Sequence, residues 1–215
     1  MSKKIFWIIG IIAVCIIGII LLTDAGQETA VAEIDYENQP FMGDENAPVE
    51  IIEFGDYKCP HCGEFNSSVM PFIKEEFIDT GKAKLYFMNY AFIAVDSTTS
   101  ALYAETVYQE LGNEVFWEFH DQLFANQTTA EGQENFMDEE FLTAILSEVA
   151  SKEEVEKVVQ AFSENQGQES LDKDMEMANN LGVNSTPAIF IGGKKFEGTT
   201  MDDFAEKVEE AANGQ

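Results

Sequence analysis

The chain has 215 residues, with 40 acidic side chains against 12 lysines, no arginine and a formal net charge of -28. This length suits one domain with a buried core, with or without an anchor, but not two enzymatic domains. Because phosphate groups and acidic lipids are bound by clustered lysine or arginine, the composition excludes nucleic acid and an acidic membrane surface as partners. We interpret the acidic residues as a solvated protein surface. The alternative is that they form a docking surface for basic partners.

Residues 1–22 differ from everything that follows. The segment Ile5–Leu22 carries no charge, and as a helix it would be about 27 Å long, close to the thickness of a bilayer's hydrocarbon core. Two lysines precede it and an acidic chain follows, so we expect a membrane anchor that places residues 23–215 outside the cytoplasm. A cleavable signal peptide is the alternative, since residues 30–32, Ala-Val-Ala, offer a cleavage site. We interpret Cys15, inside the apolar run, as a lipid-facing or helix-packing thiol.

Both alternatives export the rest of the chain to a compartment where disulfides persist, so Cys59 and Cys62 can be oxidised. Residues 23–46 are small, acidic and without sustained apolar periodicity. We therefore expect an acidic tether there, with one short edge strand in the segment 32–36.

Residues 47–96 show the pattern of a strand, a helix and a second strand. The segment 49–56, VEIIEFGD, is rich in Val, Ile and Phe, which is typical of a buried strand. An apolar stripe at helical spacing then predicts a helix from Pro60 to Asp79, ended by a Thr-Gly pair. Alternation and aromatic content predict a second strand over 82–92.

Residues 97–182 are predicted to be a helical insertion. Apolar side chains recur at spacings of three and four, and Gly112 separates the first two helices. Ser151 and Glu154 form a capping box at the start of another. The predicted helices cover residues 97–111, 113–127, 138–149, 151–162 and 168–182.

Strand signals return in residues 183–215. The segments 187–193 and 194–199 predict two strands joined by a turn at Gly192-Gly193, and a last helix is expected over 201–212. The whole order predicts an α/β protein with a mixed central sheet flanked by helices. A CxxC pair at the head of the first helix is typical of a thioredoxin-like redox motif, so we predict a thioredoxin fold with an inserted helical domain.

The stretch Cys59-Pro60-His61-Cys62 carries the chemistry. A helix N-terminus presents free N–H groups and a positive dipole that stabilise a thiolate, and Cys59 lies at that end. Pro60 suits the first turn, where its missing N–H costs nothing. We expect a protonated His61 to favour the Cys59 thiolate further, and Cys62, one turn into the helix, to be shielded.

Two other uses of the pair stay open. A structural disulfide would close only a short loop, which gains little stability. Zinc would have only Cys59, Cys62, His61 and His120 as ligands, and His61 lies between the cysteines at an awkward spacing. We therefore predict no metal ligand set. A structural calcium ion on an acidic loop stays an expectation without a motif.

Three segments together resemble a known family. They are EFGDYK followed by CPHC at 53–62, FWEFHDQLF at 116–124 and VNSTPAIFIGG at 183–193. Over about residues 40–212 the chain resembles the DsbA-type thiol:disulfide oxidoreductases, most closely the membrane-anchored, BdbD-like members of Gram-positive bacteria.

The resemblance implies roles for further residues. Pro187 matches the cis-proline of the family and would lie beside Cys59, where the backbone of Thr186 could pair with a substrate strand. Glu53 matches the buried acid beneath the active site and would accept or relay the proton of Cys62. His120 is interpreted as structural.

The implied activity is donation of the Cys59-Cys62 disulfide to unfolded exported proteins with free thiols, through a mixed disulfide on Cys59. The redox-active disulfide would be the only cofactor. A membrane-bound, quinone-coupled thiol oxidase of the DsbB or BdbC kind would reoxidise the enzyme, and the N-terminal helix would keep both in the cell membrane. The alternatives are a disulfide isomerase or reductant on the same fold, or a binding or chaperone-like module with a structural disulfide.

Overall fold

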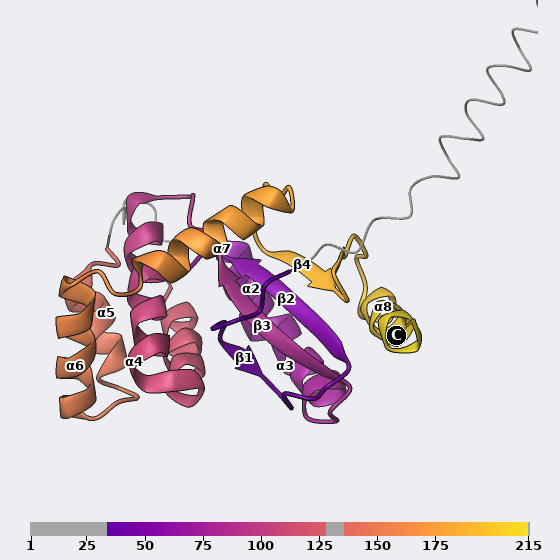
Figure 1. Ribbon diagram of the computed structural model, residues 1–215, viewed down its shortest axis with the longest axis horizontal. Helices are drawn as coiled ribbons and strands as arrows, with labels where there is room; N and C mark the ends of the chain where they lie inside the picture. The colour runs from indigo at the N-terminus through magenta and orange to yellow at the C-terminus, as the bar shows by residue number, and fades with distance from the viewer. Residues whose placement is uncertain (1–33, 128–135, 215) are drawn as a thin grey trace, which may run out of the picture. The chain divides into compact units, whose positions relative to one another are not determined.

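The computed structural model describes residues 34–127 and 136–214 (Figure 1). The predicted anchor, Ile5–Leu22, lies outside the described residues, as do residues 23–33 of the predicted tether. Among the helices within the described ranges, none is long and apolar enough to cross a membrane.

A mixed sheet of five strands forms the centre of the domain, in the order β1-β3-β2-β4-β5. The central strand β2 pairs in parallel with β3 and antiparallel with β4, as a mixed sheet requires. The outer strands β1 and β5 pair antiparallel with β3 and β4. The strands are β1 (Phe41–Met42), β2 (Val49–Gly55), β3 (Ala83–Asn89), β4 (Ala188–Ile191) and β5 (Lys194–Lys195).

Helices cover both faces of this sheet (Figure 1). Successive side chains of a strand point to opposite faces. Val49 and Ile51 of β2 therefore contact the helical run that follows β2, whereas Ile52 and Phe54 pack on the other face against α7. Glu53 shares the face of Ile51. The helices are α2 (Pro60–Glu64), α3 (Met70–Ile73), α4 (Val95–Ala125), α5 (Glu139–Leu146), α6 (Lys152–Ser163), α7 (Gln168–Asn180) and α8 (Met201–Asn213).

The predicted helix from Pro60 is confirmed in extent but is not uniform. Two π-helical segments interrupt it, η1 (Phe65–Val69) before α3 and η2 (Lys74–Ile78) after it. Pro71, at the start of α3, cannot donate an N–H one turn back, and the wider turn of η1 directly precedes it. The apolar stripe still reaches the core, because Phe65, Ile73 and Phe77 are buried.

The helical insertion begins with α4, which is broken where the sequence predicts. Gly112 has φ 79° and ψ -172°, a conformation that separates two helical halves and that glycine adopts readily. The capping box is also confirmed: the Ser151 N–H donates to Glu154 Oε2 at 2.8 Å, and the Glu154 N–H donates to Ser151 Oγ at 3.4 Å.

The predicted tether extends too far into the domain. Its described part, residues 34–46, packs on the sheet: the Tyr36 ring lies 4.6 Å from that of Tyr86, and Gln39 is buried. The described part of the predicted edge strand, 34–36, forms no strand, and the edge strand is β1 instead. Isolated apolar residues among acidic ones carry no periodicity, which is why the sequence did not show this packing.

Three other boundaries differ from the prediction. Helix α7, which we assigned to the insertion, lies over the sheet, where Ala178 joins the cluster of Ile52 and Phe54. The strand predicted over 82–92 ends at Asn89. The strand predicted over 194–199 pairs only at Lys194–Lys195, because the chain turns toward α8.

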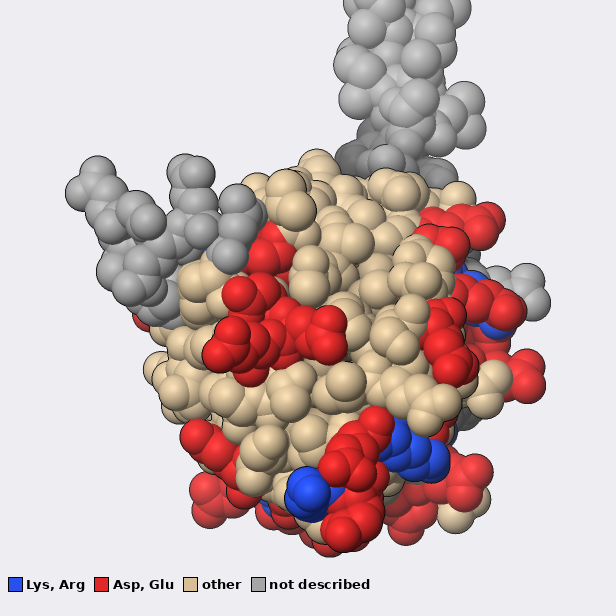
Figure 2. Space-filling view, turned by 90° about the vertical axis from the view of Figure 1, so that its left-hand side faces the viewer, with Lys and Arg blue, Asp and Glu red and all other residues tan. Residues whose placement is uncertain are grey.

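Acidic side chains gather on the face formed by the insertion (Figure 2). The two lysines of α6 are both paired there: Lys152 lies 3.4 Å from Glu156, and Lys157 lies 2.9 Å from Glu110. The charge of this face is therefore mostly negative.

Candidate active site

Cys59 lies at the N-terminus of α2, directly after the loop that follows β2. Its N–H donates to the Asp56 carbonyl at 2.9 Å, which closes a turn. Its own carbonyl accepts the first helical hydrogen bonds, from Cys62 N at 3.1 Å and Gly63 N at 3.2 Å. Pro60 occupies the first turn, as predicted. Cys59 is therefore the N-cap residue, with the free N–H groups of the helix start beside its side chain.

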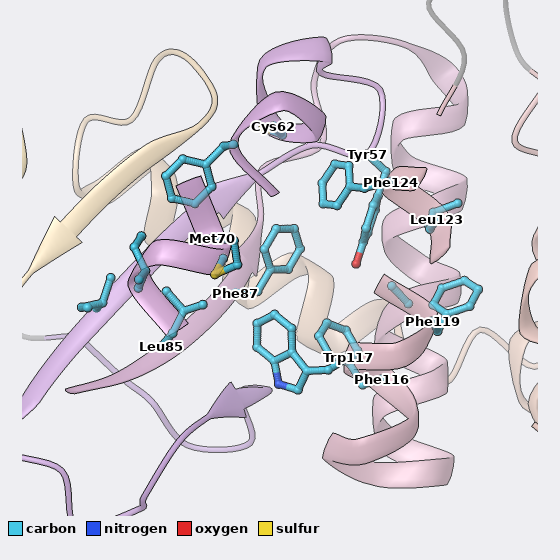
Figure 3. Close-up of a cluster of buried hydrophobic side chains, with 14 of the residues drawn as sticks. Tyr57, Cys62, Met70, Leu85, Phe87, Phe116, Trp117, Phe119, Leu123 and Phe124 are labelled. Atoms are coloured by element: carbon cyan, nitrogen blue, oxygen red, sulfur yellow. The ribbon is translucent and has the colours of Figure 1, made fainter. Parts of the chain in front are cut away.

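The two cysteines are free thiols that differ in access. Cys59 is 4% exposed and Cys62 is fully buried. Figure 3 shows Cys62 at one end of the buried cluster that also holds Phe87 and Phe124. Of the two sulfur-bearing residues, only Cys59 therefore has any solvent-accessible surface.

The surroundings separate the pKa values of the two thiols. A hydrogen bond from Cys62, followed by contacts with Thr186 and the backbone N–H groups of Cys62 and His61, lowers the pKa of Cys59 to about 5, although burial opposes this. The same bond to Cys59, burial and the charge of Glu53 raise the pKa of Cys62 well above its ordinary value. At neutral pH the reduced pair therefore holds one thiolate, on Cys59.

His61 acts differently from the prediction. Its side chain is 79% exposed, with Nδ1 3.8 Å from Glu64 Oε2. Its contribution to the lowered pKa of Cys59 comes from the backbone N–H rather than from the ring. Water screens the electrostatic interactions of a side chain this exposed.

Glu53 is buried on the sheet face that α2 covers, 1% exposed. Neither carboxylate oxygen has a hydrogen-bond partner among the described residues. Burial, and secondarily the charge of Cys59, raises the pKa of Glu53 to about 8. An uncompensated charge is costly at such a position, so the group holds a proton at neutral pH. Glu53 lies close enough to the two cysteines for its charge to influence the pKa of Cys62 and for that of Cys59 to influence its own.

Thr186 and Pro187 lie beside Cys59, joined by a cis peptide bond. Cys59 Sγ lies 3.3 Å from the Thr186 carbonyl oxygen, within donating distance when the thiol is protonated. A groove of about 450 Å³ adjoins Pro187. Apolar side chains that include Phe65 and Val69 of η1 line it, together with the charged side chains of Lys195 and Glu197.

The sequence did not single out the residues that hold the active-site loop. Asp56 is buried, and its Oδ2 accepts the N–H groups of Phe92 at 3.0 Å and Ile93 at 3.1 Å. Lys58 Nζ lies 3.0 Å from Asp96 Oδ2, at the start of α4. These contacts tie the loop to the segment that begins the insertion. The only signal for them in the sequence was that two charged residues, Asp56 and Lys58, directly precede CPHC.

His120 is structural, as interpreted. It is fully buried, with Nδ1 3.1 Å from the Tyr57 hydroxyl. Burial lowers the pKa of His120 to about 3, so the ring is neutral. Its neighbours are the aromatic rings of the cluster in Figure 3, among them Phe116 and Phe124.

No group of three or more His, Cys, Asp or Glu side chains that could hold a metal ion occurs in the described part of the chain. Two buried carboxylates do lie together, away from CPHC. Asp174 accepts hydrogen bonds from Gln39 Nε2 at 2.7 Å and from the Asn89 N–H at 2.7 Å, and Glu105 accepts one from Asn89 Nδ2 at 2.7 Å. Three oxygens of this cluster lack partners among the described residues: Gln39 Oε1, Asn89 Oδ1 and Glu105 Oε2.

The thiol assignment has a direct spectroscopic test. In the reduced protein, ultraviolet absorbance is expected to show one thiolate forming near pH 5, because of the contacts that lower the pKa of Cys59. Cys59→Ser should remove the step. Cys62→Ala should move it to higher pH, because the thiol hydrogen bond is the largest stabilising contact. A single step near the ordinary value of 9 in the wild type would contradict the assignment.

The family model described as Thioredoxin matches residues 35–210. The probable disulfide bond formation protein D of Bacillus cereus is 35% identical over 158 residues, which cover 74% of this chain and 72% of that protein. Disulfide bond formation protein D of Bacillus subtilis is 31% identical over 198 residues, which cover 90% of this chain and 86% of the relative.

Solved structures agree. The crystal structure of oxidised BdbD from Bacillus subtilis matches with a TM-score of 0.78 and 30% identity, covering 86% of this chain and 98% of that one. DsbA of Chlamydia trachomatis shares the fold, with a TM-score of 0.72 and 24% identity over 88% of this chain and 98% of that one. The chain thus belongs to the thioredoxin family and, as a DsbA-type protein similar to the Bacillus disulfide bond formation proteins D, is a thiol:disulfide oxidoreductase.

Proposed function

We propose that the protein donates the Cys59-Cys62 disulfide to exported proteins with free thiols. This proposal rests on the pKa values of the two thiols, which are shifted in opposite directions. The pKa of Cys59 is lowered to about 5, and that of Cys62 is raised. A stabilised Cys59 thiolate favours the reduced pair, and a couple whose reduced form is stabilised is a strong oxidant.

In the proposed reaction a substrate thiolate attacks Cys59 Sγ of the disulfide. The Cys59-Cys62 bond breaks, a bond between the substrate sulfur and Cys59 forms, and Cys62 leaves as a thiolate. Cys62 then takes a proton, which the neutral Glu53 carboxyl beneath it can supply. The pKa of Glu53, near 8, suits a group that both gives and regains a proton near neutral pH.

The second substrate thiolate then attacks the substrate sulfur of the mixed disulfide. Cys59 leaves as a thiolate, which is favoured because its pKa is low. The substrate has lost two electrons and gained a disulfide, and the enzyme pair has gained both electrons. We propose that the Thr186 backbone and the groove beside Pro187 hold an extended substrate segment while this happens.

A reduced enzyme needs an oxidant for the next turnover. We propose a membrane-bound, quinone-coupled thiol oxidase of the BdbC or DsbB kind, which would take both electrons from Cys59 and Cys62. This proposal places the catalytic domain on the extracytoplasmic side of the cell membrane, held there by the segment Ile5–Leu22. The support is the resemblance to the Bacillus proteins and the apolar N-terminal sequence.

The reduction potential tests this function directly. The full chain would be equilibrated in detergent with glutathione buffers, and its thiols trapped and counted. We expect a value near or above about -150 mV, which a disulfide donor requires. A value near about -270 mV, that of thioredoxin, would contradict disulfide donation and favour a reductant or isomerase.

We also propose that the buried cluster around Asp174 and Glu105 is where a structural calcium ion would bind. Carboxylate and amide oxygens are the ligands that calcium prefers, and the unpartnered oxygens of Gln39, Asn89 and Glu105 fit this preference. Burial, followed by the charge of Asp174, raises the pKa of Glu105 well above its ordinary value, and burial raises the pKa of Asp174 to about 6, so the pair retains a proton near that pH. An ion would replace that proton and add positive charge between helices α4 and α7.

Calcium is then expected to raise the melting temperature of the protein at neutral pH. At a concentration about 100 times the dissociation constant, binding to the folded state alone adds about 2.7 kcal/mol to the free energy of unfolding. Glu105→Gln, which mimics the protonated acid, should lose this response, and magnesium serves as the control for general screening of the acidic surface. Equal melting temperatures with calcium and with a chelator would contradict the site.

A further inference from the structure

Gln127 reaches the active-site loop from the helical insertion. It lies just beyond the end of α4, 70 residues from Tyr57 and 68 from Cys59 in sequence. Its Nε2 donates to the Tyr57 carbonyl at 2.6 Å and to the Cys59 carbonyl at 2.9 Å. One amide group therefore binds the backbone carbonyls of Tyr57 and Cys59, the residues on either side of Lys58. Cys59 is the residue that carries the thiolate.

Helix α2 leaves room for this amide at Gly63. A Cβ built on Gly63 would lie 2.5 Å from Gln127 Oε1, closer than real contacts of this kind, and 3.4 Å from its Cδ. Glycine inside a helix is less favourable than alanine, so this glycine has a local cost in helix stability. The close approach of the Gln127 side chain explains why a glycine occupies position 63, one residue after Cys62.

The Cys59 carbonyl is part of the environment of its own thiolate. It accepts hydrogen bonds from the N–H groups of Cys62 and Gly63, which begin α2, and the Gln127 amide supplies a third donor. Three donors reduce the negative charge that this oxygen presents to the sulfur. They also hold Cys59 in the N-cap conformation, in which backbone N–H groups lie beside its side chain.

The other contacts of the loop do not reach Cys59 in this way. Asp56 binds the N–H groups of Phe92 and Ile93, and Lys58 pairs with Asp96. These contacts hold the residues before the cysteine. The carboxamide of Gln127 is the side-chain group that the described insertion places on the backbone of Cys59 itself.

We propose that Gln127 is a positioning residue for the redox reaction: its carboxamide holds the Cys59 carbonyl from the helical insertion and thereby sets how strongly the Cys59 thiolate is stabilised. The inference rests on the proposed role of Cys59 as the nucleophile and leaving group of the mixed disulfide. It assigns the insertion a role in tuning the reduction potential, in addition to covering the core.

The test compares Gln127→Ala with Asn126→Ala. Asn126 is the adjacent exposed amide, whose Nδ2 donates only to the Gln122 carbonyl of its own helix among the described contacts, so it is a matched control. Gln127→Ala is expected to raise the pKa of Cys59 and to shift the exchange equilibrium with glutathione toward the oxidised protein by a factor of roughly three to ten, the range for one hydrogen bond. Asn126→Ala should leave both unchanged.

Gly63→Ala provides a second, independent variant. Its new methyl group displaces the Gln127 amide, so it should shift the exchange equilibrium in the same direction as Gln127→Ala. In the Gln127→Ala background the same substitution should have little further effect, because the group that it displaces is gone. Additive shifts would overturn the proposal.

The outcomes also separate this inference from the proposed function. If the wild type is oxidising with a low Cys59 pKa, and Gln127→Ala lowers only the melting temperature, the residue is merely structural and the inference fails alone. If the wild type itself has a thioredoxin-like potential, disulfide donation fails, whatever the variants show.

Discussion

Replacing Cys62 with serine is expected to stop the reaction at its halfway point. Cys59 keeps a lowered pKa, because a serine hydroxyl can donate in place of the Cys62 thiol, and it still forms mixed disulfides with oxidised partners. Cys62 is no longer present to attack the sulfur of Cys59 and release them. Complexes should accumulate that resist boiling in detergent and dissociate with a reductant. Turnover of a reduced, unfolded substrate should fall to the background rate.

Cys59→Ser is the matched control, because it leaves the second thiol in place. Cys62 is fully buried and its pKa is raised, so this variant should neither turn over nor trap any partner. Non-reducing electrophoresis of both variants, with thiols alkylated at the time of lysis, separates the roles. Equal trapping by the two variants would show that Cys62 is accessible and would contradict the assignment of Cys59 as the exchanging cysteine.

Replacing Glu53 with glutamine is expected to make the reduced protein more stable at alkaline pH. The folded state retains the Glu53 proton up to about pH 8, whereas an unfolded chain loses it near the ordinary value of 4.5. Between these values the folded state holds more protons, so stability falls as pH rises, by about 1.4 kcal/mol for each pH unit. The wild type should therefore lose on the order of 4 kcal/mol across this range through this group, and the variant should not.

Denaturant titrations at pH 4, 6 and 8 measure this effect on the two proteins. Their free energies of unfolding should be similar at pH 4 and diverge toward pH 8. Glu50→Gln is the control on the same strand, because its carboxylate is partly exposed and lies 3.4 Å from Lys84 Nζ. In the oxidised protein the divergence should be smaller, since the Cys59 thiolate, the second cause of the raised pKa, is absent. Parallel curves for wild type and Glu53→Gln would exclude a buried, protonated acid.

Catalysis gives a second readout for the same variant. The neutral amide cannot give a proton to Cys62 or take one from it, so the steps in which Cys62 changes protonation should slow. Reoxidation of the reduced enzyme needs the Cys62 thiolate and should show the larger effect. If the substitution changes neither the rate of substrate oxidation nor the rate of enzyme reoxidation, Glu53 affects only the stability of the protein.

Local patterns determined most of the architecture of this protein. The order of strands and helices, the break at Gly112 and the capping box at Ser151 follow from apolar periodicity and from turn and capping residues that lie within a few positions of one another. The reactive pair was equally visible, because Cys59 and Cys62 stand one helical turn apart and the strand before them sets the helix start. Contiguous signals of this kind need no knowledge of the rest of the chain.

Only the tertiary structure decided the environment of that pair. Whether Glu53 is buried, whether the His61 ring faces the sulfur, and which groups bind the Cys59 backbone depend on segments far apart in sequence. Gln127 contacts Tyr57 across 70 residues, and Gln39 contacts Asp174 across 135. Single polar residues of this kind carry no period and no motif, and their pKa values and hydrogen bonds arise only when packing excludes water around them. For this physical reason the sequence determined the reactive atoms, and the folded structure decided their protonation.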